Sequence, residues 1–260
     1  MLYLLSPAKR LDYETPVPAA VRRKATDPLF IDRAAELIEV LRRQTPAQVA
    51  ALMELSDDLT ALNVARYAAW QPQPAPQAVK PAVLAFDGDV YEGLQARTLG
   101  AADLTWAQRH LVILSGLYGV LRPLDRLQPY RLEMGSPLRT RHGKDLYAYW
   151  GDTLAQWLHQ QLQAQRTKVL VNLASVEYAR AALRPALSAR VIDCVFEDGQ
   201  PGAWKVVSFF AKRARGRFAR WAIDGRIDRP SALTAFDADG YAYDPGVSTP
   251  DRLVFRRRSA

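Results

Sequence analysis

The sequence is poor in the residues that stabilise small proteins through disulfides or metal ions. It contains one cysteine, Cys194, and three histidines, His110, His142 and His159. A lone cysteine excludes a disulfide framework within the chain and favours a reducing compartment. The histidines follow no metal-ligand spacing, and without a cysteine pair an iron–sulfur cluster of the usual thiolate kind is excluded. We therefore expect no metal site and no cofactor.

Cys194 itself lies in the apolar run Val191–Phe196, which is typical of a buried strand. A cysteine in that setting packs as a small hydrophobic residue, whereas a redox sensor needs an accessible thiolate. We interpret Cys194 as a core residue and keep redox sensing as the alternative.

Long hydrophobic runs, flexible linkers and internal repeats are missing as well. No apolar run approaches the roughly 20 residues that span a bilayer, and Met1–Ser6 is too short and wrongly flanked for a signal peptide. Hydrophobic residues make up 49% of the chain, which is enough for a sizeable core. We expect a soluble, cytoplasmic protein with a single domain over residues 1–260 and no membrane partner.

The pattern of apolar runs predicts an α/β fold, with a mixed α+β arrangement as the alternative. Strands are expected at Met1–Leu5, Pro81–Phe86, Leu111–Leu114, Val169–Asn172, Val191–Phe196 and Trp204–Ser208. Helical patterns at 93–110, 144–164 and 176–184 lie between them. Several strands are continuously apolar, so we expect a central, mostly buried sheet flanked by helices.

The region before these elements predicts a loop over 12–26 and then three helices. Asp27-Pro28 reads as a helix start, and the spacing of Phe30, Ala34, Leu37, Ile38 and Leu41 predicts one buried face ending near Gln44. Thr45 and Gln48 form a capping-box pattern for a short helix to about Leu55. Ser56-Asp57-Asp58 then starts a third helix that carries Leu59, Leu62 and Trp70.

Four predicted strands run into polar residues at their carboxyl ends, where open α/β sheets bind ligands. The stretch after Leu114 is the richest, because Gly116 and Gly119 allow close backbone approach and Pro123 and Pro129 stiffen the loop. We predict a polar pocket lined by Lys9, Asp89, Tyr91, Ser115, Tyr118, Asn172, Ser175 and Glu177, joined by Arg122, Arg131 and Glu133. The alternative is that these residues are helix caps and turn formers. A hydrated Mg²⁺ on Asp87, Asp89, Asp125 and Glu133 is a weaker alternative.

A net charge of +8 favours a polyanionic partner, and the cations cluster along Lys205–Arg226. As a helix, this stretch buries Phe210, Ala214, Phe218 and Trp221, and Gly216 lets a backbone or a phosphate come close. Its cations are Lys205, Lys212, Arg213, Arg215, Arg217, Arg220 and Arg226, against the single acid Asp224. Such a row suits contact with phosphates, and the alternative is a solvated basic surface. The tail Arg256–Arg258 either adds to this patch or is disordered.

Several longer motifs resemble the YaaA-like peroxide-stress protein family over essentially the whole chain. They are Leu5–Lys9, Phe86–Leu94, Leu114–Asp125 with Pro129–Gly135, Gly143–Tyr147 with Trp150-Gly151, Asn172–Tyr178 and Phe210–Gly216. The resemblance implies a cytosolic DNA-binding protein of the peroxide response, with a family-specific mixed α/β architecture and a positively charged cleft. It also implies a helix-hairpin-helix element, which we place at about 45–70. It implies no settled enzymatic activity.

These observations leave three classes of function open. The leading hypothesis is a protein that binds duplex or distorted DNA, largely independently of sequence, and protects or helps repair it. The residues expected to contact DNA are Lys9, Arg122, Arg131, Lys144, Lys212, Arg213, Arg215, Arg217 and Arg220. The second is an enzyme acting on a nucleobase, nucleotide or DNA backbone in the strand-end pocket. The third is a structural partner of DNA-repair proteins. The chain carries no Walker-type loop, dinucleotide fingerprint or recognisable Ser-His-Asp triad.

Overall fold

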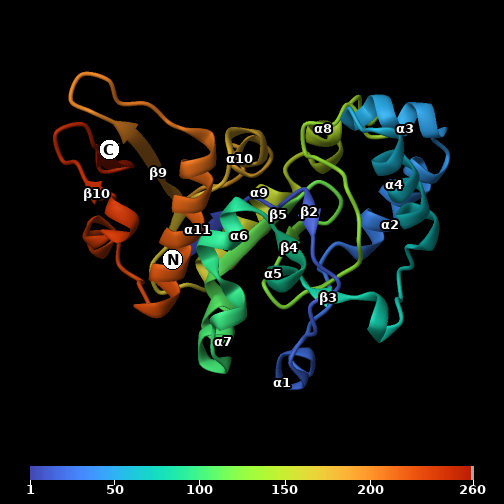
Figure 1. Cartoon of the computed structure of the whole chain (residues 1–260), viewed down its shortest axis with the longest axis horizontal. Coiled ribbons are helices and arrows are strands. Elements are labelled where there is room, and N and C mark those ends of the chain that lie inside the picture. The colour runs from blue at the N-terminus through green and yellow to red at the C-terminus, as the bar shows by residue number, and fades with distance from the viewer. Residues whose placement is uncertain (259–260) are drawn as a thin grey trace.

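A seven-stranded sheet runs through the molecule, in a computed structural model that describes residues 1–258 (Figure 1). Its order is β10-β11-β9-β8-β1-β5-β6. The strands are β1 (Leu2–Leu5), β5 (Leu111–Ser115), β6 (Gly119–Leu121), β8 (Val169–Asn172), β9 (Arg190–Gly199), β10 (Ala242–Tyr243) and β11 (Arg252–Arg258). The five strands from β11 to β5 pair in parallel, and β6 and β10 pair antiparallel at the two edges.

Helices cover both faces of this sheet. On one face, α7 (Ala101–His110) and α11 (Ser208–Asp224) contact each other and β1. On the other face lie α9 (Thr153–Gln163) and α10 (Val176–Ala182), which contact one another (Figure 1). Every residue of β1 and β5 is buried, as expected of strands covered on both sides. The predicted α/β class, with a central buried sheet in a single domain, is confirmed.

Three helices pack together at the far end of the molecule from β10 (Figure 1). They are α2 (Ile31–Arg42), α3 (Pro46–Met53) and α4 (Asp57–Ala69). The predicted capping box is present, since Thr45 and Gln48 exchange hydrogen bonds of 2.8 and 3.3 Å. The predicted start at Asp27 is wrong, because Phe30 is the N-cap and the Asp27 carboxylate accepts from Arg126 instead. Of the apolar residues expected on the third helix, Leu59 and Leu62 are exposed and Trp70 is its buried C-cap residue. The helix itself buries Thr60, Asn63 and Tyr67.

Two of the predicted strands are wrong. The run Pro81–Phe86 is divided among β3 (Lys80–Pro81), the helical turn α5 (Ala82–Ala85) and β4 (Phe86–Asp87). Its backbone amides donate to carbonyls of the loop after β6 rather than to a strand. The prediction failed because a short apolar run suits a buried helical turn as well as a buried strand. The run Trp204–Ser208 holds only an isolated bridge between Asp198 and Lys205, and its last residue, Ser208, begins α11.

Other segments carry more regular structure than expected. The loop 12–26 contains the short helix α1 (Ala19–Arg22), and the patterns over 93–110 and 144–164 each divide into separate helices. The additional elements are β2 (Arg10–Leu11), α6 (Asp89–Leu94), β7 (Arg126–Leu127) and α8 (Leu146–Trp150). The basic tail is strand β11, in which Arg256 pairs with Glu197, so the alternative of a disordered tail is wrong. Over residues 1–258, no helix has the length and apolarity needed to cross a membrane.

Helices α6 and α11 are in backbone contact through two glycines. A Cβ on Gly216 would lie 1.7 Å from the Val90 carbonyl oxygen, and one on Gly93 would lie 2.1 Å from the Arg213 carbonyl oxygen. Both distances are far below any normal carbon–oxygen contact. The sequence predicted that Gly216 admits a backbone or a phosphate, and the backbone of α6 is what it admits.

This contact predicts the effect of adding one methyl group. Gly216→Ala is expected to destabilise the protein by about 1–3 kcal/mol or more, because overpacking against the α6 backbone outweighs the better helix propensity of alanine. Chemical denaturation measures the free energy of unfolding. The control is Gly246→Ala, whose Cβ meets only the end of the Asp244 side chain at 3.3 Å and should change it by less than about 0.5 kcal/mol. Equal stability of the two variants would contradict the packing argument.

Candidate functional site

A pocket of about 540 Å³ opens at the carboxyl ends of β1 and β8. One wall is the segment Ser6–Arg10 after β1, and another is formed by Ser175, Glu177 and Tyr178 around the start of α10. The start of α6, one side of α11 and the segment Tyr130–Glu133 complete it. The parallel neighbours β8 and β1 bring these segments together, as the carboxyl-end rule predicts.

The charges that line this pocket balance. Its five cationic side chains are Lys9, Arg10, Arg131, Lys212 and Arg215. Its five carboxylates are Asp87, Asp89, Glu92, Glu133 and Glu177. The expected positively charged cleft is therefore not this pocket, whose lining has a formal charge of zero.

Most of the pocket's cations face a carboxylate. Glu133 accepts Lys9 at 2.9 Å and Arg131 at 3.2 Å. The Arg10 guanidinium lies 2.6 Å from the Asp87 carboxylate, and this hydrogen bond raises the pKa of Arg10. Lys212 lies 3.9 Å from Asp89, at the limit of an ion pair. The pairs made by the exposed Lys9, Arg10 and Lys212 add little to stability, and they keep these side chains oriented around the opening.

Two hydroxyls and a carboxylate fix the loops of the pocket to one another. The Ser175 amide donates to the Ser6 hydroxyl at 2.9 Å, and the two hydroxyls lie 3.3 Å apart. Glu177 accepts the Gly135 amide at 2.8 Å. Of the residues expected in the pocket or at DNA, the pocket brings together Lys9, Asp89, Arg131, Glu133, Ser175, Glu177, Lys212 and Arg215.

Three of the predicted pocket residues lie in the core instead. Tyr91 donates to the Ser6 carbonyl at 3.1 Å, and burial raises its pKa. The Ser115 hydroxyl lies 2.6 Å from that of Tyr130, and burial raises the pKa of Tyr118 to about 12. All three side chains are buried and none lines the pocket, so the prediction that they line it is wrong. The alternative reading of turn-forming residues describes them better.

Further predicted residues are engaged outside the pocket. Asn172 donates to Asp193 at 2.7 Å and lines a separate hollow. Arg122 was expected at DNA, yet its guanidinium lies 2.8 Å from the fully buried Asp125. Burial raises the pKa of that carboxyl, and the bonds from Arg122 oppose the shift. Lys144 is exposed just before α8 and outside the pocket.

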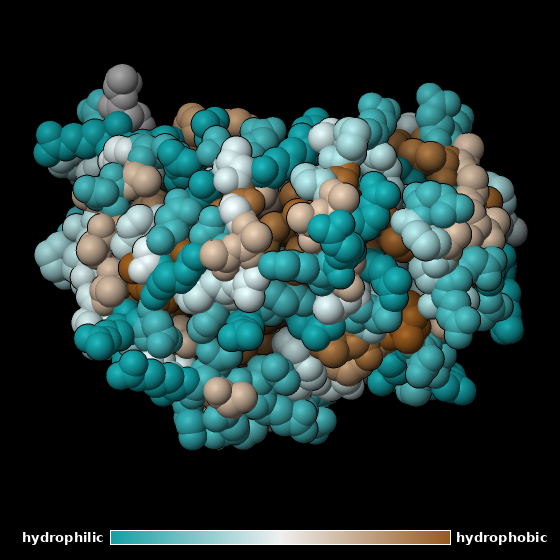
Figure 2. Space-filling model, turned by 90° about the horizontal axis from the view of Figure 1, so that it is seen from below, coloured by the Kyte–Doolittle hydropathy of each residue, from teal (hydrophilic) through white to brown (hydrophobic). Residues whose placement is uncertain are grey.

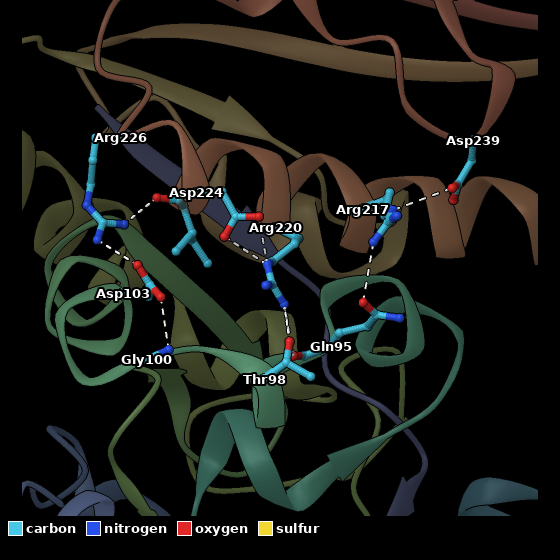
Figure 3. A network of polar contacts seen from close by, with 10 residues as sticks. Gln95, Thr98, Gly100, Asp103, Arg217, Arg220, Asp224, Arg226 and Asp239 are labelled. Carbon is cyan, nitrogen blue, oxygen red and sulfur yellow. Dashed lines mark hydrogen bonds and ion pairs between the residues drawn. The ribbon is translucent and has the colours of Figure 1, made fainter.

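The basic row of α11 divides into a bound half and a free half. Figure 3 shows Arg217 and Arg220 turned toward neighbouring elements. Arg217 lies 3.4 Å from Asp239, and Arg220 pairs with Asp224 at 2.9 Å and donates to the Gln95 carbonyl at 3.2 Å. The expectation that these two arginines face DNA is therefore not met. Earlier on the helix, Arg213 is exposed and forms no ion pair within residues 1–258.

The pocket also contains residues that the sequence analysis missed as site residues. Arg10 follows directly on Lys9, and the antiparallel β2–β4 pairing places it beside Asp87, which was considered only as a Mg²⁺ ligand. Tyr130 and Tyr178 lie within quoted motifs, and their neighbours Arg131 and Glu177 were the ones selected. The charge of Arg10, directly after the selected Lys9, is the signal that could have identified it as a site residue. Among residues 1–258, no three His, Cys, Asp or Glu side chains are grouped so that they could hold a metal ion.

With the fold and the site described, comparison with known proteins defines the class. The chain belongs to the family described as peroxide stress protein YaaA, whose model matches residues 1–247. It is 61% identical over 260 residues to a UPF0246 protein of Leptothrix cholodnii, covering 100% of both chains. It is 57% identical to one of Variovorax paradoxus, covering 99% of each, and 54% identical to one of Bordetella pertussis, covering 100% of each. The resemblance inferred from the motifs is confirmed.

Cys194 is the single cysteine of this peroxide-stress family member, so the reactivity of its thiol can be tested directly. Cys194 lies on β9 with 5% of its surface exposed, and burial raises the pKa of its thiol. Because the thiolate is the reactive form, we expect iodoacetamide at pH 8 to label Cys194 only after unfolding. Mass spectrometry with and without denaturant measures this. Rapid labelling of the native protein, or its oxidation by dilute peroxide, would reverse the interpretation of Cys194 as a core residue.

Proposed function

We propose that this protein binds DNA during peroxide stress and helps protect or repair it, thereby limiting iron-driven damage. The observation that carries the proposal is the run of one-signed charge from Gln200 nearly to the end of α11. Residues 200–223 contain six lysines and arginines and no acid. Contacts of lysine and arginine with phosphates provide affinity without sequence preference.

The geometry of α11 supports its first half as the contact surface. Lys205 and Arg213 are exposed and form no ion pair within the described chain, and Lys212 is held only loosely, 3.9 Å from Asp89. Phe209 and Phe210, between these cations, are 50% and 41% exposed, so the prediction that the helix buries Phe210 is wrong. Aromatic rings among cations suit stacking on unpaired bases, so the surface fits distorted or single-stranded DNA as well as duplex.

The proposal depends less on the expected helix-hairpin-helix element and on the expected protein partners. The hairpin of α3 and α4 turns at Glu54, which adopts a left-handed conformation with φ of 52°, and its helix-hairpin-helix role stays a prediction. An association with DNA-repair proteins also stays a prediction. Figure 2 shows that hydrophilic residues cover most of the face seen from below and that its hydrophobic areas are small and separate. That face favours a polar partner over a protein docked through apolar contacts.

Charge reversal on the first half of α11 tests the proposal. For Lys212→Glu/Arg213→Glu we expect weaker binding to duplex, bubble and single-stranded DNA alike. The slope of log affinity against log salt should fall by about 2, since each lost phosphate contact removes roughly 0.9. The matched control is Arg22→Glu/Arg23→Glu, which reverses two exposed charges at the end of α1. Fluorescence anisotropy across a salt series measures both. Wild-type affinity that does not change with salt would refute the proposal.

For the second half of α11 we expect the opposite result, in which a substitution lowers stability and leaves DNA binding unchanged. Arg220 has a side chain only 19% exposed and is held by Asp224 and by Gln95. Arg220→Gln should therefore lower the free energy of unfolding by about 0.5–1 kcal/mol and leave the salt slope of DNA binding unchanged. Denaturation and anisotropy on one preparation test this. A smaller salt slope with unchanged stability would extend the DNA surface to this half of the helix.

A further inference from the structure

Arg215 is a largely buried cation without a partner. Among the described residues, the buried side-chain nitrogens that lack a hydrogen-bond partner are Arg33 Nε and Arg215 Nε. The Arg33 guanidinium donates to the Tyr149 carbonyl and lies 4.3 Å from the Tyr149 ring centroid. Arg215 forms no hydrogen bond and no ion pair within residues 1–258, and burial lowers its pKa. A guanidinium that is only partly exposed and has a buried nitrogen without a partner is costly, so it requires a functional explanation.

The position of Arg215 suggests what would satisfy it. Its side chain lines the strand-end pocket and also a second hollow of about 390 Å³. Two of the pocket's carboxylates are engaged by other cations, since Glu133 holds Lys9 and Arg131, and Asp87 holds Arg10. No carboxylate of the described chain lies within ion-pair distance of Arg215. The planar guanidinium fork matches an oxyanion, and phosphate best of all, through paired hydrogen bonds.

The volume and the other lining residues of the pocket suit a ligand larger than a phosphate. Its volume of about 540 Å³ falls in the roughly 300–1,000 Å³ range of small-molecule sites. Asp89 and Glu177 bring carboxylate oxygens to the lining, and these accept hydrogen bonds from amino and ring N–H groups of the bases. Tyr130 and Tyr178 add aromatic surface to the wall. A phosphate beside a hydrogen-bonding planar ring is the chemistry of a nucleotide.

We propose that this pocket holds a single nucleotide, with its phosphate on Arg215 and its base against the carboxylates of the opposite walls. The nucleotide is either a free mononucleotide or an unpaired one turned out of bound DNA. The second source rests on the proposed function, because Lys212 and Arg215 lie on the same helix as the proposed DNA surface. The balanced charge of the lining fits this ligand, since a polyanion would need a net positive channel.

Calorimetric titration with the four deoxynucleoside monophosphates and with inorganic phosphate tests the pocket. We expect at least one monophosphate to bind with a Kd below about 1 mM and more tightly than phosphate alone. Arg215→Gln should raise that Kd about tenfold or more, and Arg215→Lys should restore part of the affinity. The control is Arg43→Gln, at an exposed cation after α2 that lies outside the pocket. Thermal melting is the second readout, because removing an unpaired buried charge should leave the unliganded protein at least as stable.

The possible outcomes separate this inference from DNA binding itself. Absence of nucleotide binding, binding unaffected by Arg215→Gln, or phosphate binding as tightly as the nucleotides would overturn the assignment. If Lys212→Glu/Arg213→Glu abolishes DNA binding and Arg215→Gln abolishes only mononucleotide binding, the pocket takes the free ligand. If Arg215→Gln also removes the preference for a bubble over duplex, the pocket takes a nucleotide from DNA. Mononucleotide binding without any DNA binding would leave the pocket standing and refute the proposed function.

Discussion

The backbone contact between α6 and α11 is the constraint on which the site depends. Gly93 and Gly216 bring the two helix backbones so close that no side chain fits between them. Asp89 begins α6, and Lys212 and Arg215 lie about one turn or less before Gly216 on α11. The contact therefore sets both the width of the pocket on this side and the positions of the charges that line it. Helices held apart by larger residues would carry the same side chains without converging on one opening.

The cations of α11 fall into two groups, those that are used in contacts within the protein and those that remain available to a partner. Along α11 the later arginines are used to join elements, as Arg217 does with Asp239 and Arg220 with the Gln95 carbonyl. The earlier cations remain available, and Arg215, close to them on the helix, is partly buried without being paired. A net charge thus says little about where a polyanion binds, because formal charges already consumed by internal pairs contribute little to the outside field.

The sequence predicted the sheet better than the site. Hydrophobic runs in β1, β5, β8 and β9 identified the central strands, since burial on both faces leaves a strong signal. The run 81–86 failed because a buried helical turn has the same composition as a buried strand. Polar residues in the loop after β5, Ser115 among them, were predicted at the pocket and lie in the core. A residue list cannot distinguish a hydroxyl that binds a ligand from one that satisfies a neighbouring tyrosine, since only three-dimensional packing decides between them.

The order of strands has a consequence for synthesis on the ribosome. Strand β9 has both neighbours parallel to it, β8 before it in the chain and β11 long after it. Until residues 252–258 emerge, one side of β9 presents unpaired amides and carbonyls. Open edges of this kind recruit strands from other chains. The nascent protein therefore passes through an interval in which its longest strand is an open edge. Helix α11, made in that interval, packs on the face of β9 and leaves this edge unpaired until β11 is made.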